Sequence, residues 1–595
     1  MERLSYRVRT VTRLARFRPH LRGTSLATVR LDVTAGLTVA ALAVPQGLAY
    51  ALVAGVPPEM GLYAAAIPTL LAALFGSSPY LVTGPTNPIA LVIGVSIVAP
   101  ALAEGRPVPI DEVLATGLLA GLLLAGFGLI GLGRTSRFLS DSVLAGFATG
   151  AGILIALRQI PALAASATPP SGESALAPAI WWLLLDAARA LADAEPRALA
   201  LALGVPAVVL ALRRIDPRIP AALIGLGGAT LAARALGWDS GPHALATLGA
   251  IPASFAQFGF PAFGAPERIA APALAVAMLA TLQSVAAART LRPADFRPLD
   301  TDRELVSQGV ANVAASLTGA LPTSGSLTRS ALARSAGGRS RLAPAMSGLA
   351  IAALLPLFGP ALEHVPLAAL VGLVVMSGLD LVNVRGIRRA STTRGDIAVL
   401  LVTLVATLWI DLLQALYAGL FLSLALLVRR AGRLQMVELV RSGTGRFSEI
   451  PIDSRTGDTP AVLLHLEGDL NFAVAEELAD HLLEVGRRGP RVVVLRLKRA
   501  RHLDATVLES LRHAAEELKR SGTLVVVCGL TDQLAALLAE TELCELLGPD
   551  GLLRAGPRLF EGFERALRRI RTLLRPLADD EIFRSEGPVG WMYEI

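Results

Sequence analysis

Two short polar stretches interrupt otherwise apolar sequence, and their residue types suit the binding of an anion. The first is Thr83–Pro88 (TGPTNP) and the second is Leu321–Ser330 (LPTSGSLTRS). Proline removes a backbone donor and glycine weakens a helix, so a continuous membrane helix is not expected to use this combination of Pro, Gly and polar residues. A helix that begins inside the membrane would, because its free N–H groups and positive dipole end then face a polar cavity. Two such breaks in corresponding positions of two halves indicate a transporter's binding site.

Arg329 adds a full positive charge one turn into the second of these short helices. A guanidinium holds an oxyanion through two N–H donors, and an ionisable residue inside a membrane is by default a candidate for function. The alternative is that the side chain extends to water at the cytoplasmic edge, since the helix is short. We predict the first, in a membrane transporter for small anions.

The composition places most of this chain in lipid. Of its 595 residues 53% are hydrophobic and only 17% are charged, against about 25% charged in an average soluble protein. The net charge of +7 comes mainly from arginines. They lie between apolar runs, where they set membrane orientation, so we expect no nucleic-acid partner. Cys528 and Cys544 lie in the polar C-terminal part, and they imply no disulfide framework.

Fourteen apolar runs follow a basic cytoplasmic segment at residues 1–30, and they predict about 14 transmembrane elements. The runs cover residues 33–52, 59–75, 85–101, 111–133, 137–158, 196–213 and 219–236, then 270–288, 304–320, 326–337, 342–358, 366–383, 396–411 and 413–429. Several are shorter than the about 20 residues of a full span. We therefore predict a transmembrane domain at 31–430 with repeats at 31–237 and 268–430, and an interfacial helix in the charged stretch 176–194.

The loop arginines predict the orientation. Those that fall on one side of this count are Arg134, Arg137, Arg213, Arg214, Arg218, Arg289, Arg292, Arg297, Arg303, Arg334, Arg339, Arg341, Arg385, Arg388, Arg389, Arg394, Arg429, Arg430 and Arg433. The positive-inside rule makes that side cytoplasmic, so both termini lie inside a multi-pass protein of the inner (plasma) membrane. Seven elements per half also force the second half to enter from the opposite face, which gives an inverted repeat.

The composition becomes soluble near residue 434. Val462–Leu466, Val492–Leu497 and Leu524–Cys528 are predicted strands, and Ala473–Val485 and Thr506–Leu518 between them have helical periodicity. Strands that alternate with helices favour a small α/β domain, which we place at 434–571 and expect to fold alone. It lacks the glycine-rich turn of a dinucleotide fold. Residues 572–595 are predicted to form an extended or peripheral tail.

Several motifs resemble those of a known family. They are Asp32–Val39 (DVTAGLTV), Val44–Tyr50 (VPQGLAY), Gly55–Glu59 (GVPPE), Gly61–Tyr63 (GLY), Glu304–Asn312 (ELVSQGVAN), Ser326–Ser330 and Gly337–Gly338. Together they resemble the sulfate permease (SulP) family of anion transporters, and the C-terminal unit resembles its STAS domain. The resemblance covers nearly the whole chain, and its combination of motifs is specific.

The resemblance implies a seven-plus-seven inverted-repeat fold of the uracil-permease type, an elevator-like cycle and a homodimer in lipid. It further implies transport of sulfate, bicarbonate, chloride, oxalate or dicarboxylates, held between the two half-helices and lined by the first span. The matching positions are Gln46, Tyr50, Thr86, Asn87, Ser326, Thr328 and Arg329. Simpler roles stay open for four of them: Gln46 bonding a neighbouring helix, Tyr50 packing, and Thr86 with Asn87 capping a helix.

Gln283 occupies a stretch where relatives commonly carry Glu or Asp, associated with proton or sodium coupling. Glutamine has a similar shape but no titratable group. We name Gln283 the coupling position and expect no obligatory cation symport, although coupling through other groups stays open.

We expect no enzyme, cofactor or metal site. The two lysines, Lys498 and Lys519, each precede arginine, so no P-loop exists. The histidines of the soluble domain, His465 among them, show no metal-ligand spacing. Thr506 resembles a phosphorylated position of related anti-sigma antagonists, but a helix-start threonine is more often a cap. The alternatives to an inorganic-anion carrier are a dicarboxylate carrier, or an anion conductance or sensor that signals through STAS to a cytoplasmic partner.

Overall fold

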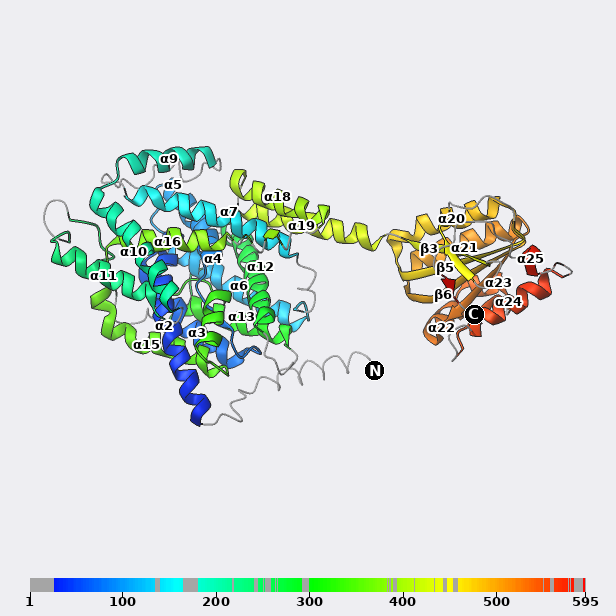
Figure 1. The fold of residues 1–595 in the computed structure, drawn as a ribbon, viewed down its shortest axis with the longest axis horizontal. Helices are drawn as coiled ribbons and strands as arrows, with labels where there is room; N and C mark the ends of the chain where they lie inside the picture. The colour runs from blue at the N-terminus through cyan, green and yellow to red at the C-terminus, as the bar shows by residue number, and fades with distance from the viewer. Residues whose placement is uncertain are drawn as a thin grey trace. The chain divides into compact units, whose positions relative to one another are not determined.

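A computed structural model gives the fold, and it divides into two compact units, Met1–Ser423 and Leu424–Ile595, each described by itself (Figure 1). The residues described are 26–133, 140–163, 180–216, 219–239, 244–249, 251, 258–262, 264, 266–291, 299–382, 384, 387–388, 393–410, 412–432, 434–441, 447–452, 459–548, 550–556, 561–575, 577, 579–582 and 592–593. Most of the predicted N-terminal segment lies outside these residues, as do Arg134, Arg137, Arg218, Arg292, Arg297, Arg385, Arg389 and Arg433.

The first half of the helical unit contains every element predicted for it. Its elements are α2 (Leu26–Ala54), α3 (Pro58–Phe75), β1 (Val82–Gly84), α4 (Asn87–Ile93), η1 (Gly94–Val98), α5 (Ala99–Ala103), α6 (Ile110–Leu129), α7 (Asp141–Gln159), η3 (Ile160–Leu163), α9 (Ile180–Ala192), α10 (Pro196–Ile215) and α11 (Ala221–Ala235). The segments α4, η1 and α5 follow one another without a break. They form the short helix expected after the first polar stretch.

The second half repeats this order of elements. It consists of α12 (Pro266–Thr290), α13 (Thr301–Leu317), β2 (Ser324–Ser326), α14 (Leu327–Ser335), α15 (Leu342–Leu362), α16 (Leu367–Leu381), α18 (Arg394–Trp409) and α19 (Leu412–Ala431). In each half a three-residue strand and a short helix follow the second long helix. The helical fold with about fourteen elements is thus confirmed.

The described helices include six that are long and apolar enough to cross a membrane, namely α2, α3, α6, α7 with η3, α10 and α12, and several shorter apolar ones. The helix α9 has only 13 residues, too few to span. Trp181 and Trp182 on α9 are 66% and 56% exposed, whereas Leu183 and Ala187 are buried. In Figure 1, α9 lies along one rim of the helical unit. The helix is thus too short to span, and its place at the membrane interface stays a prediction.

Small residues let the helices that surround the polar breaks approach closely. A Cβ atom at Gly61 on α3 would collide with the backbone oxygen of Gly47 on α2. A Cβ atom at Gly309 on α13 would lie 2.7 Å from the backbone oxygen of Gly121 on α6. Glycine pairs are a common solution in membranes, where helices associate through close packing. Gly47 follows Gln46 directly, so this contact also fixes the backbone next to Gln46.

Two buried carboxylates connect the halves. Asp32 on α2 accepts hydrogen bonds from the backbone N–H groups of Arg339 (2.6 Å) and Ser340 (3.1 Å). Glu304 on α13 accepts from the N–H groups of Ser77 (2.8 Å) and Ser78 (3.0 Å). Each carboxylate therefore satisfies backbone donors in a loop of the other half, next to the strand or half-helix that carries the polar stretch. The two motifs that begin with Asp32 and Glu304 serve this packing.

The C-terminal unit contains a seven-stranded sheet with the strand order β8-β7-β6-β5-β3-β4-β9. The strands are β3 (Gln435–Arg441), β4 (Phe447–Ile450), β5 (Ala461–Leu470), β6 (Val492–Leu503), β7 (Leu524–Leu530), β8 (Leu552–Arg554) and β9 (Met592–Tyr593). The run β5 to β8 is parallel, and β3, β4 and β9 add antiparallel pairs.

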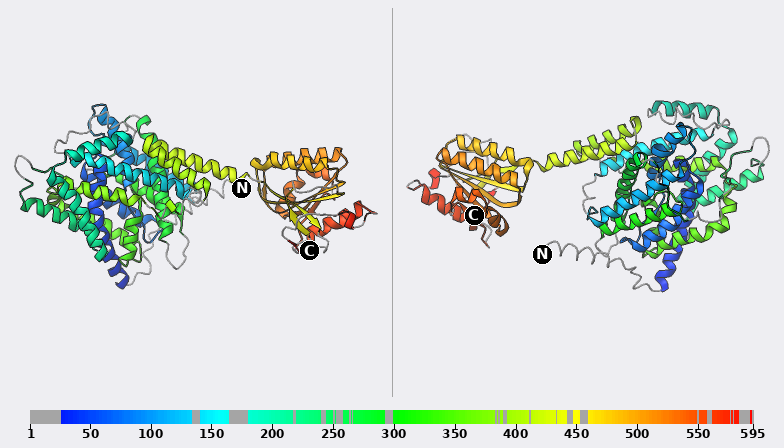
Figure 2. Two further views of the ribbon diagram at one scale, coloured as in Figure 1. Left: turned by 45° about the horizontal axis from the view of Figure 1, so that its top comes forward. Right: turned by 180° about the vertical axis from the view of Figure 1, so that it is seen from behind.

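Helices cover both faces of this sheet (Figure 2). They are α20 (Ala475–Arg487), α21 (Ala505–Arg520), α22 (Asp532–Ala539), α23 (Glu542–Leu547), α24 (Glu561–Leu573) and α25 (Asp579–Ile582). The first four pack on one face through residues such as Leu478 and Leu511. On the other face α24 packs through Phe563 and Ile570. The predicted strands and helices between 462 and 528 all appear: α20 has the expected length but starts two residues later, and the others are longer than expected.

The C-terminal unit extends further than the predicted 434–571. Leu574 and Ile582 are buried in the core beneath α24, and β9 pairs with β4 through Phe447 and Tyr593. The predicted tail at 572–595 therefore contributes to this unit, apart from residues 576, 578, 583–591 and 594–595, which lie outside the described residues. Local patterns could not predict this, because β9 has only two residues and α25 only one turn.

Candidate anion-binding site

The two polar stretches lie side by side because their strands pair. β1 and β2 form a two-stranded antiparallel sheet in which Val82 pairs with Ser326 and Gly84 with Ser324. Side chains on other elements bind the outer backbone groups: Ser330 accepts from Val82 N (2.8 Å), and Ser284 on α12 accepts from Gly325 N (2.9 Å). Backbone groups that a helix break leaves open are thereby satisfied inside the membrane. The pairing brings the starts of α4 and α14 to one place.

Arg329 is buried at this junction. It lies in the first turn of α14, whose N-cap Ser326 accepts from its backbone N–H. The side chain is 1% exposed, so it does not reach water as the alternative interpretation required. Its Nη2 atom donates to the backbone oxygen of Pro85 (2.7 Å). Its Nε and Nη1 atoms are buried and have no hydrogen-bond partner among the described residues. A buried cation with open N–H donors is suited to bind an anion.

Gln283 joins both breaks to α12. Its Oε1 atom accepts hydrogen bonds from the hydroxyl groups of Ser324 (2.6 Å) and Thr86 (3.1 Å). These two hydroxyl oxygens lie 2.9 Å apart. The hydroxyl of Thr86 makes no side-chain cap bond to α4. It bonds to Gln283 instead of capping the helix, which was the simpler role considered for it. Gln283, which the sequence analysis named the coupling position, thus contacts both breaks.

Two further amide side chains, both on α13, form hydrogen bonds with β1 and with the residue that precedes β2. Gln308 donates from Nε2 to the hydroxyl of Thr83 (2.7 Å). Asn312 donates to the backbone oxygen of Thr323 (2.9 Å) and accepts from the N–H of the same residue (2.7 Å). Both amides are fully buried. They belong to the motif Glu304–Asn312, but nothing in the sequence alone showed which group each would contact.

The remaining predicted residues have mixed surroundings. Asn87 is 3% exposed and Tyr50 is 8% exposed. The Oδ1 atom of Asn87 and the Oε1 atom of half-buried Gln46 have no partner among the described residues. They could take a donor from a hydrated or protonated ligand. Thr328, in contrast, is exposed, and among the described residues no hydrogen bond connects it to Thr86, Gln283 or Ser324.

Gly84 provides the surface against which the Arg329 guanidinium lies. A Cβ atom at Gly84 would be 2.8 Å from Nη1 and 3.1 Å from Nη2 of Arg329. We expect Gly84→Ala to displace the guanidinium and to weaken the apparent anion affinity by up to about tenfold, or about 1.4 kcal/mol. Concentration-dependent uptake into liposomes measures this change. Gly204→Ala on α10 is the control, because its Cβ would meet nothing within 4 Å. Equal affinity in both variants would show that Arg329 does not need this surface.

Comparison with known proteins agrees with the assignment made from the motifs. The sulfate permease family matches residues 29–403, and the STAS domain matches residues 451–559. The putative sulfate transporter YvdB of Bacillus subtilis is 26% identical over 536 residues, 90% of this chain and 97% of that protein. The probable sulfate transporter Rv1739c of Mycobacterium tuberculosis is 29% identical over 547 residues, 90% and 96% of the two chains. The bicarbonate transporter BicA of Picosynechococcus sp. is 26% identical over 542 residues, 88% and 93% of the two chains.

Solved structures show the same fold. The murine anion transporter Slc26a9 in its inward-facing state superposes with a TM-score of 0.80 at 16% identity, over 94% of both chains. The transmembrane domain of a cyanobacterial bicarbonate transporter BicA gives a TM-score of 0.58 at 24% identity, over 66% of this chain and 98% of that one. The relatives are named as transporters, and the predicted absence of an enzyme activity is confirmed. The chain belongs to the sulfate permease family, and it is a multi-pass anion transporter with a C-terminal STAS domain.

Proposed function

We propose that this transporter carries a small inorganic anion of the sulfate, bicarbonate and chloride class, bound between the starts of α4 and α14. One observation supports this most directly: the guanidinium of Arg329 is buried, with two of its nitrogen atoms without partners among the described residues. Among the described residues no carboxylate forms an ion pair with it, and an uncompensated cation is costly inside a protein. A bound anion would remove that cost, and the positive ends of both helices would add to its binding.

Transport follows an elevator-like cycle in this proposal, and the helix packing supports it. In one group α13 packs on α6, α15 packs on α2 and α3, and α12 packs on α6. In the other, α7 packs on α16 and α18, and α10 packs on α11 and α16. Fewer contacts join the groups, and most involve α2 against α11 and α16. The first group contains both breaks and would move as a rigid body with its anion along the second.

The cellular arrangement is proposed from the arginines and from the family resemblance. Both termini and the STAS domain lie in the cytoplasm, the protein is inserted in the inner (plasma) membrane, and two copies form a homodimer. The two halves form an inverted repeat, so α4 and α14 approach the midplane from opposite sides. This places the anion near the midplane, where movement of the first helical group exposes it to either face.

Reconstitution into liposomes tests the proposed function. Labelled sulfate, bicarbonate, chloride and a small dicarboxylate would each be supplied, with and without sodium and proton gradients. We expect saturable uptake of at least one inorganic anion that a second anion inside the vesicle accelerates. Uptake of the dicarboxylate alone would overturn the substrate class. Large passive anion currents without saturable uptake would overturn the carrier mechanism.

The boundary of the STAS unit gives a separate prediction. A fragment of residues 434–595 should unfold cooperatively, whereas the fragment 434–571 should be less stable by about 3–6 kcal/mol. The shorter fragment lacks the buried side chains of Leu574 and Ile582, and each is worth about 1.5–3 kcal/mol when buried. Urea unfolding followed by circular dichroism measures the difference. Two fragments of equal stability would place both side chains outside the folded core.

Removal of the same unit from the full protein should leave the anion preference unchanged, because neither half-helix belongs to it. We expect the loss of this unit to affect assembly or regulation. Gel filtration in detergent measures assembly, and the total uptake of anion measures regulation. A truncated protein that folds well but prefers a different anion would contradict this division of labour.

A further inference from the structure

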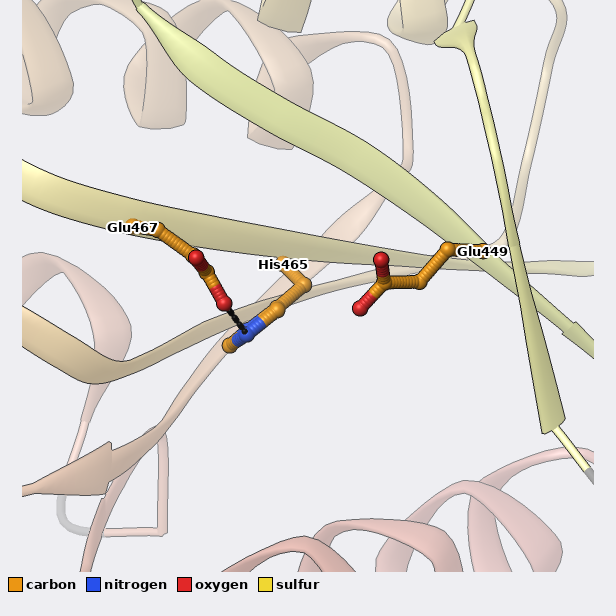
Figure 3. Close-up of side chains that lie close together, drawn as sticks. All are labelled: Glu449, His465 and Glu467. Atoms are coloured by element: carbon orange, nitrogen blue, oxygen red, sulfur yellow. Dashed lines mark hydrogen bonds and ion pairs between the residues drawn. The ribbon is translucent and has the colours of Figure 1, made fainter. Parts of the chain in front are cut away.

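Three side chains of the C-terminal unit gather on the sheet face that α24 covers (Figure 3). They are Glu449 on β4 and His465 and Glu467 on β5, and one nitrogen or oxygen atom from each lies within 4.8 Å of the others. Glu449 pairs with Leu439, which belongs to the core beneath α24. The strand β3 lies between β4 and β5. The group therefore connects two strands that are not neighbours in the sheet.

Both ring nitrogens of His465 face acceptor oxygens. The side chain is 2% exposed. Nδ1 lies 3.3 Å from the backbone oxygen of Arg496, and Nε2 lies 3.0 Å from Oε1 of Glu467. A neutral imidazole has one N–H, so it can donate to only one of these oxygens. The other nitrogen then directs a lone pair at an acceptor. Either a second proton or another cation must lie at this contact.

The third group favours a metal ion over the second proton. A proton on Nε2 would be shared with Glu467 alone, whereas Glu449 brings a further carboxylate oxygen within 4.8 Å of the other two ligand atoms. An ion at this place would let the ring donate its single N–H from Nδ1 to the backbone oxygen of Arg496, while Nε2 and both carboxylates face the ion.

We propose that Glu449, His465 and Glu467 form a binding site for a divalent first-row transition metal of the Zn²⁺ type. An N–H donated from Nδ1 to a backbone oxygen is the usual way in which a protein orients a metal-binding histidine, with Nε2 as the ligand. One imidazole and two carboxylates, with water as the fourth ligand, form a donor set that suits Zn²⁺. The spacing of histidines in the sequence could not show this site, because its ligands come from two strands separated by a third.

The ion would act as a cross-link within the STAS domain. It would join β4 to β5 across β3, and β4 also holds the C-terminal strand β9. The edge of the sheet formed by β4 and β9 would therefore be held to the parallel strands by the metal in addition to the backbone ladder.

Calorimetric titration of Zn²⁺ into the full-length protein tests the proposal. The protein is prepared without a polyhistidine tag and stripped with a chelator. We expect one tight site per chain, and we expect Glu449→Gln and Glu467→Gln each to weaken binding more than tenfold, since even the loss of an outer-shell partner costs about 10–100-fold. His513→Ala is the matched control: His513 also lies near a glutamate (3.4 Å from Glu509), but its side chain is 64% exposed. The His513→Ala variant should bind Zn²⁺ with the affinity of the unaltered protein.

X-ray absorption at the zinc edge identifies the ligands. We expect nitrogen and oxygen neighbours without sulfur, which separates this site from one at Cys528 or Cys544. Circular dichroism of the two glutamine variants should match the unaltered protein, because glutamine keeps the shape of glutamate. Equal Zn²⁺ affinity in the unaltered protein and the double variant Glu449→Gln/Glu467→Gln would overturn the proposal. So would nitrogen NMR that shows both ring nitrogens of His465 protonated at saturating Zn²⁺.

Discussion

Arg329→Ala is expected to weaken the apparent affinity for the transported anion by roughly 10- to 100-fold. The Nε and Nη1 atoms of the guanidinium are buried and have no hydrogen-bond partner among the described residues, while Nη2 donates to the backbone oxygen of Pro85. A hydrogen bond to a charged group is worth about 1.5–3 kcal/mol, and 1.4 kcal/mol corresponds to tenfold. Arg329→Lys should recover only part of the affinity, because an ammonium is a point charge without the planar fork of donors.

Arg334→Ala provides the control for charge removal on the same helix. Arg334 is exposed and lies over the ring of Tyr80, 5.7 Å from its centroid. Uptake at a series of anion concentrations would be measured for the three variants in liposomes of equal protein content. The proposed site would be wrong if Arg329→Ala transported with the affinity of the unaltered protein. A loss of similar size in Arg334→Ala would show that the effect comes from general surface charge.

The helical elements could be predicted because each depends on local sequence. A membrane span needs a long apolar run, and a broken span needs proline, glycine and polar residues, so periodicity and composition were sufficient. The short strands β1 and β2 could not be predicted in the same way. Each has three residues, and they pair with each other across more than half of the helical unit's sequence. Pairing at that separation is decided by tertiary packing, which local patterns do not contain.

The sequence was sufficient to predict which stretches form the site, but not which side chains contact one another within it. The sequence indicated both breaks, Arg329 and the position of Gln283. It did not indicate Ser324, whose hydroxyl group contacts Gln283. The family resemblance indicated Thr328 as a site residue, but this residue is exposed. Thr328 and Arg329 are consecutive on a helix, so their side chains point about 100° apart and cannot both face the same buried place. Ser324 precedes the helix and escapes that restriction.

Gln283→Glu is expected to make transport depend on pH, with uptake rising as the pH falls. The carbonyl oxygen of Gln283 accepts from Thr86 and Ser324, and a carboxyl group can keep both bonds. An ionised carboxylate would add a negative charge next to the anion, and protonation would remove it. A carboxyl buried in a protein commonly titrates closer to neutral pH than one in water. The variant should therefore approach the unaltered protein in acid and lose at least about tenfold in affinity above neutrality, as a repulsion of about 1.4 kcal/mol predicts.

The unaltered protein should in turn need no cation gradient, because glutamine at this position has no proton to exchange and no charge to balance a bound sodium ion. Uptake would be followed from pH 5 to 9, with and without sodium, for both proteins. Gln159→Glu at the end of α7 controls for an added carboxyl group elsewhere, and it should keep the pH profile of the unaltered protein. Uptake by the unaltered protein that collapses without sodium, or that follows an imposed proton gradient, would show that other groups hold the coupling ion. Backbone oxygens at helix breaks would then be the first groups to test, since they can bind sodium without any carboxylate.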